Sequence, residues 1–241
     1  MKQPLFPSYV RTAILYFLSL EIVCLLARSI TIYLVTGSLF DRSISPPPEI
    51  ALFYRVLQFV LAAGIVVWLG KKLQLQWSLR FINRKHFFLF LGVACLFLVN
   101  NSLSAVYSSD AAAFNQEIYT NLGIYFLLIT FSSTWEELLY RGAVQSYIDT
   151  HHTSLSSSVE QQGFYISYGN KWATLLMFAR HLGFFLVFDF AFALTGLLLV
   201  LVFSLVAGWM RSTTRSLILP ILLHCCCNYI YLSVHAYFAI A

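Results

Sequence analysis

"NLGIYFLLITFSSTWEELLYRGAVQSY", residues 121 to 147, joins a strongly apolar run to two adjacent acids, Glu136 and Glu137. The apolar run has the composition of a membrane-spanning segment. Ionisable groups inside a membrane are costly unless they are partnered, so they are functional candidates by default. The stretch therefore predicts a helix that carries two carboxyl groups into a membrane.

The composition of the whole chain agrees with this reading. Of its 241 residues, 59% are hydrophobic and 10% are charged, whereas an ordinary soluble domain carries about 25% charged residues. The apolar runs leave no polar segment long enough to fold alone. The sequence predicts an all-α fold, a polytopic membrane helical bundle built as one integral-membrane domain over residues 1–241, and we expect it in a bacterial plasma membrane.

The apolar runs predict where the chain crosses the membrane. A helix of about 20 apolar residues spans the ~30 Å hydrocarbon core. About seven runs qualify, and they are Thr12 to Val35, Ile50 to Leu69, His86 to Val106, Leu122 to Tyr140, Trp172 to Phe188, Phe190 to Met210 and Ser216 to Ala239.

Lysine and arginine collect in short cytoplasmic loops and so predict the orientation. Lys2 and Arg11 precede the first run, and a basic segment, Lys71 to Lys85, follows the second. The N-terminus is therefore predicted to be cytoplasmic. This asymmetry and attraction to anionic lipid explain the net charge of +5. The expected partners are membrane lipid and a peptide or protein substrate, with no nucleic acid.

The last four runs contain most of the polar groups that need an explanation. They are Glu136, Glu137, Arg141, Arg180, His181, Asp189, His224 and Asn228. Glu137 and Arg141 are four residues apart and are predicted to form a structural ion pair along one helix face. Glu136 points about 100° away from that face. Arg180 and Asp189 are expected to anchor helix ends or to lock two helices together.

Depth along the helices brings four of these residues to one level. Counted from the cytoplasmic helix ends, Glu136, His181 and His224 lie ~12 to 16 Å inward. Asn228 shares a face of the last span with His224, because the two are four residues apart. We expect these four side chains to line one cavity that opens towards the cytoplasmic face.

Three short motifs in this half of the chain resemble those of a known family. "EELLYR" (Glu136 to Arg141) has the form EExxxR, "MFARH" (Met177 to His181) is similar to FxxxH with Met177 in place of Phe, and "HCCCN" (His224 to Asn228) has the form HxxxN. In this order they resemble the CPBP family of intramembrane proteases, which includes the CAAX-processing enzyme of the Rce type and bacterial Abi proteins. The catalytic motifs would lie within residues 122–239.

The resemblance implies an endopeptidase that hydrolyses a peptide bond of a membrane-associated or lipid-modified substrate. Glu136 and His181 would hold and activate a water molecule, with Glu136 as the general base. His224 and Asn228 would stabilise the oxyanion that forms at the scissile carbonyl. No cofactor is expected in this mechanism.

Three alternatives remain open from the sequence. Glu136, His181 and His224 form a plausible zinc set with an open position for water, although HExxH is missing and Asn228 is a poor zinc ligand. A proton-coupled transporter also uses intramembrane Glu and His. A catalytically silent membrane scaffold or immunity protein would keep the fold without needing Glu136.

Overall fold

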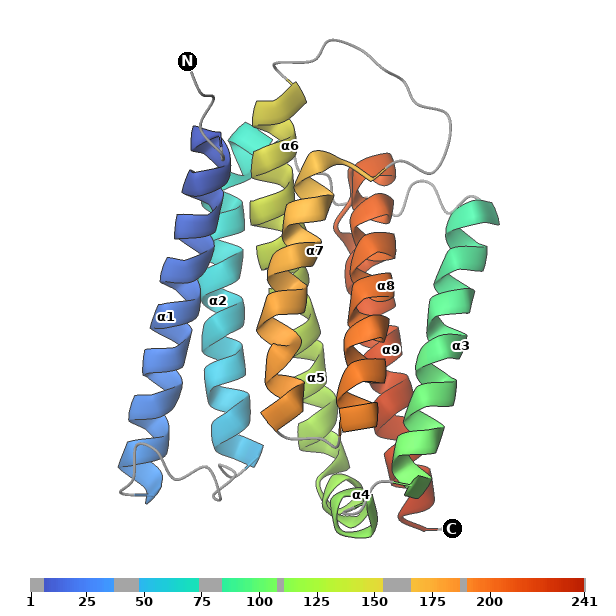
Figure 1. The fold of residues 1–241 in the computed structure, drawn as a ribbon. Coiled ribbons are helices and arrows are strands. Elements are labelled where there is room, and N and C mark those ends of the chain that lie inside the picture. The colour runs from blue at the N-terminus through green and yellow to red at the C-terminus, as the bar shows by residue number, and fades with distance from the viewer. Residues whose placement is uncertain are drawn as a thin grey trace.

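The computed structural model describes residues 7–36, 48–73, 84–107, 111–153, 166–186 and 190–240, and these are almost entirely helical. The helices run roughly side by side in one bundle (Figure 1). In chain order they are α1 (Ser8–Thr36), α2 (Pro48–Leu73), α3 (Arg84–Tyr107), α4 (Ala111–Thr120), α5 (Leu122–Glu137), the π-helix η1 (Leu138–Gln145), α6 (Ser146–Thr153), α7 (Tyr168–His181), the 3-10 helix η2 (Leu182–Leu186), α8 (Phe190–Thr214) and α9 (Ile218–Phe238).

Four helices in the described part of the chain are long and apolar enough to cross a membrane, and they are Pro48–Trp68, Arg84–Tyr107, Phe190–Thr214 and Ile218–Phe238. Large apolar side chains cover their outer surfaces; Val67, Trp68 and Phe88 are 75%, 68% and 65% exposed. Soluble monomers rarely expose apolar patches of such extent. The all-α membrane character is thus confirmed, while the count of seven spans and the orientation stay predictions.

The segment quoted at the start forms one long helical element through the middle of the bundle. α5 passes without a break into η1 and then α6, with helical backbone angles at Leu138 and Ser146. All eight residues of η1 are buried. A π-helical turn is rare, widens the helix locally and is frequent at functional sites. Here it begins directly after the two glutamates.

The core packs around this element. α5 packs against α2 and α9, and η1 packs against α7, as the central position of α5 in Figure 1 suggests. The largest side chains that are fully buried include Trp135, Tyr140, Met177 and Phe203. The carboxyl groups of α5 therefore point into packed protein.

α7 differs from its predicted span, Trp172 to Phe188. It begins earlier, at Tyr168, because the Ser167 side chain accepts a hydrogen bond from the Asn170 backbone N–H and caps the helix. Its α-helical part ends at His181, and the 3-10 turn η2 follows. Gly208 lets α8 approach closely, since a Cβ there would meet Asn170 Oδ1 at 1.8 Å. Because α7 ends where η2 begins, His181 is the last α-helical residue of α7.

Candidate active site

Glu136 and Glu137 both lie inside the bundle, with exposed fractions of 7% and 0%. Adjacent residues on a helix point about 100° apart, so the two carboxyl groups meet different partners. Among apolar helices each of them requires a partner of opposite charge or a hydrogen-bond donor.

Glu137 contacts two side chains through its two oxygens. Its Oε2 lies 3.4 Å from Arg141 Nε, and its Oε1 lies 2.9 Å from His224 Nδ1. The Arg141 guanidinium also donates to the backbone carbonyl and the hydroxyl of Ser204, at 3.0 and 2.8 Å. The predicted contact between Glu137 and Arg141 is present, whereas the contact between Glu137 and His224 was not predicted.

Glu136 faces the other edge of the same imidazole. Its Oε2 lies 3.9 Å from His224 Nε2. Ser132 donates to the Oε1 of Glu136 across one helical turn at 3.4 Å. His224 therefore stands between the two adjacent glutamates, with one ring nitrogen directed to each.

Polar contacts repeat along the antiparallel pair α5 and α9. One helical turn away from Glu137, the Asn228 amide donates to Ser133 Oγ at 2.9 Å. Near it, the hydroxyl groups of Thr130 and Tyr229 are 2.6 Å apart. Residues four apart share a helix face, so these contacts fix the register that aligns His224 with the glutamates.

His181 reaches the same region from α7. Its Nδ1 donates to the backbone carbonyl of Met177 at 2.8 Å, which leaves Nε2 available to another group. The ring lies near enough to Glu136 and His224 for electrostatic interaction with both. Met177, which replaces the Phe of the expected motif, is buried and has its sulfur 3.4 Å from Arg141 Nη1.

Arg180 joins α7 to α1 and α5, and its contact with Asp189 stays a prediction. Asp189, its expected partner, lies outside the described residues. Arg180 Nη1 is 3.6 Å from Glu136 Oε1 and 3.4 Å from Glu21 Oε1. The guanidinium also lies over the Trp135 ring, 4.6 Å from its centre. Glu21 was not among the predicted site residues, although an acid within the first predicted span was a signal for it.

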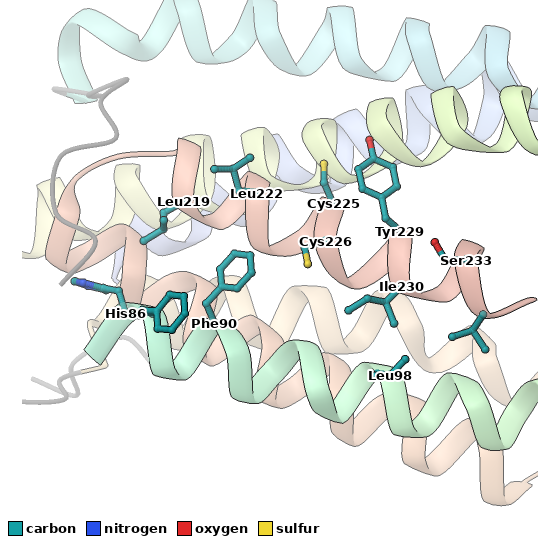
Figure 2. A pocket seen from close by; sticks show the side chains of 12 residues that line it. His86, Phe90, Leu98, Leu219, Leu222, Cys225, Cys226, Tyr229, Ile230 and Ser233 are labelled. Carbon is teal, nitrogen blue, oxygen red and sulfur yellow. The ribbon is translucent and has the colours of Figure 1, made fainter. Parts of the chain in front are cut away.

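The cavity found in the structure is a separate, apolar one. It measures about 610 Å³ and lies between α3 and α9, where His86, Phe90, Cys225 and Tyr229 are among its walls (Figure 2). None of Glu136, His181, His224 and Asn228 lines it. The expectation of one cytoplasmic cavity lined by all four is therefore not met by this cavity.

The geometry bears on the zinc alternative. In the described residues, no group of three or more His, Cys, Asp and Glu side chains is arranged to hold a metal ion. Arg180 lies 3.6 Å from Glu136, and its positive charge opposes a second cation at the same carboxylate. The residues present fit a metal poorly.

A comparison with known families identifies the class of protein. Residues 118–230 match the family described as Rce1-like, type II CAAX prenyl endopeptidase. This match supports a CPBP/CAAX protease family for the segment, and the resemblance read from the three motifs is confirmed. The matched family is a protease family, and together with the apolar helices the match supports an integral membrane protein. No curated protein and no solved structure gave a significant match.

Proposed function

We propose that the chain is an intramembrane endopeptidase in which Glu136 activates a water molecule for attack on a peptide bond. The single observation that carries this proposal is the position of His224 between two buried glutamates, with Nδ1 2.9 Å from Glu137 and Nε2 3.9 Å from Glu136. A carboxylate and an imidazole so placed can hold a water and handle its proton.

The proposed reaction needs no covalent intermediate. Glu136 takes a proton from the water, and the oxygen attacks the carbonyl carbon of the substrate. The carbon–nitrogen bond of the tetrahedral intermediate then breaks, and Glu136 returns the proton to the leaving amine. His181 helps to hold the water, since its Nε2 is left available by the bond from Nδ1 to Met177.

His224 and Asn228 are the proposed oxyanion donors. Glu137 accepts from Nδ1 and so fixes the ring orientation that turns Nε2 towards the developing oxyanion. Asn228 uses one amide hydrogen on Ser133 and has a second to give. Arg141 neutralises Glu137 from the opposite side and is a supporting residue. The metal-free mechanism is preferred to zinc because the positive charge of Arg180, 3.6 Å from Glu136, opposes a second cation there.

The proposed substrate is a membrane-associated or lipid-modified peptide. The family's description names prenyl endopeptidases, so prenylated peptides are the first substrates to test. Membrane lipid surrounds the proposed bundle, and no nucleic-acid partner is proposed.

The proposed topology has seven spans, with α1, the α5 and η1 element and α7 added to the four apolar helices, in a bacterial plasma membrane. α1 begins and α9 ends at opposite ends of the bundle (Figure 1), as an odd number of crossings requires. The basic residues around α1 and α2 support a cytoplasmic N-terminus. Residues 1–241 form one domain in this proposal.

The test is product analysis with purified protein in detergent. Prenylated and unmodified peptides are incubated with the wild-type chain and with Glu136→Gln, and mass spectrometry locates the cleaved bond. We expect cleavage by the wild type only, and Glu117→Gln, which changes an exposed acid on α4, should retain activity. A scaffold or a transporter would leave every peptide intact.

A further inference from the structure

Arg180 places one guanidinium nitrogen between two carboxyl groups from different helices. Nη1 is 3.4 Å from Glu21 on α1 and 3.6 Å from Glu136 on α5. The exposed fractions of these side chains are 22% for Arg180, 15% for Glu21 and 9% for Glu136. The three charges are thus mostly withdrawn from the surroundings of the bundle, where charges interact strongly.

Both contacts are longer than a direct hydrogen bond, which has a nitrogen-to-oxygen distance of ~2.7 to 3.2 Å. Arginine usually forms close, two-pronged pairs with carboxylates. Here the Trp135 ring lies under the guanidinium at 4.6 Å, and Glu21 attracts the same nitrogen, Nη1, from 3.4 Å. Arg180 is consequently held near Glu136 without closing onto it.

The distance matters for a general base. A nearby cation favours the ionised carboxylate, which is the form that accepts a proton. A close two-pronged pair, however, would occupy the oxygens of Glu136 and exclude the water. Glu21 attracts the same guanidinium and so opposes a close pairing of Arg180 with Glu136.

We propose that Glu21 is a positioning residue of the active site: it holds Arg180 at a distance from which Glu136 is kept charged and open to water. This inference rests on the proposed function of Glu136. It extends the site to α1, which lies outside the matched residues 118–230. Arg180 is the residue through which Glu21 acts.

A double-mutant cycle tests the proposal. Glu21→Gln should lower kcat about tenfold, the effect of a modest change in barrier, with KM and the thermal midpoint in detergent unchanged. Glu21→Asp should recover part of the loss.

Arg180→Gln should lower kcat further, because it leaves Glu21 and Glu136 as neighbouring like charges. Adding Glu21→Gln to Arg180→Gln should then raise kcat, since it removes that repulsion. Glu117→Gln serves as the matched control acid.

A second readout does not depend on activity. The fluorescence emission of Trp135 is obtained as the difference between the spectra of a protein with Trp135 and the same protein with Trp135→Phe. Glu21→Gln should change this emission in the wild-type background. In the Arg180→Gln background, Glu21→Gln should cause no further change. An unaltered kcat in Glu21→Gln, or effects of Glu21 and Arg180 that simply add, would overturn the positioning role alone. If the wild type cleaves no peptide although Trp135 emission responds, the proposed function and the positioning role fall together while the contact itself stands.

Discussion

The Nδ1 atom of His224 lies 2.9 Å from Oε1 of Glu137, a contact that joins residues 87 positions apart in the chain. Glu137 therefore contacts His224 as well as Arg141. An acid at Nδ1 fixes the orientation of the His224 ring. Of the two adjacent glutamates, Glu136 is therefore the proposed base, and Glu137 is the residue that orients His224.

The variant Glu137→Gln tests whether His224 needs the Glu137 carboxylate. The amide keeps the shape but loses the carboxylate that holds the Nδ1 side of the His224 ring, so we expect kcat to fall about 10²-fold, as for a lost oxyanion donor. Peptide cleavage rates in detergent provide the measurement. A variant with wild-type kcat would mean that His224 does not need Glu137.

Arg141→Ala should reduce the amount of folded protein as well as activity. Removing one member of a buried pair strands the other charge, at a cost of ~3 to 5 kcal/mol, and Arg141 also donates to Ser204. Folded yield and thermal midpoint in detergent are the measurements, with Lys171→Ala, an exposed basic residue, as the control. Normal stability without activity would instead put Arg141 in the chemistry.

Asn228→Ala should leave a measurable rate. Loss of a single oxyanion donor lowers kcat by ~10²- to 10³-fold, and His224 would remain as the other donor. Ser133→Ala, which removes only the partner of Asn228, should have a smaller effect. If Ser133→Ala proved the more damaging variant, the proposed role of Asn228 would be wrong.

Asp149 supplies a pH-dependent prediction outside the proposed spans. It accepts from Ser167 and the Gly169 backbone at 2.8 and 2.7 Å, yet burial raises the pKa of its carboxyl above the ordinary value. The folded chain then binds this proton more tightly than the unfolded chain. Its stabilising contribution is therefore full below the ordinary Asp pKa and is lost as pH rises through the raised pKa.

Thermal midpoints across mildly acidic pH measure this contribution. The midpoint of the wild type relative to Asp149→Asn should fall as pH rises, because the amide does not titrate. The opposite slope would show that the hydrogen bonds outweigh burial.

Much of the helical framework was predictable because a membrane span needs a long apolar run, and such runs are visible in sequence. The Glu137 and Arg141 contact was predictable because it follows from spacing on one helix. The contact from His224 to Glu137 was not, since it depends on the register between α5 and α9. The length of α7 was also missed, because Ser167 capping and the turn after His181 do not change hydropathy.

Glu21 shows a different kind of omission. It is an acid within the first predicted span, and ionisable groups in a membrane are functional candidates because their burial in lipid is costly. Its partner Arg180 was instead expected, with Asp189, to anchor helix ends or to lock two helices together. Only the packing of the helices brings Glu21, Arg180 and Glu136 together.

The most direct test of the central claim is the turnover of Glu136→Gln beside the wild type, each measured after exhaustive chelation. The account predicts that the wild type keeps its activity without metal and that Glu136→Gln loses nearly all of it, about 10²- to 10⁴-fold for a general base. Full activity in Glu136→Gln would contradict the account. Loss of wild-type activity on chelation, restored by Zn²⁺, would replace the metal-free role of Glu136 with a metal-bound water.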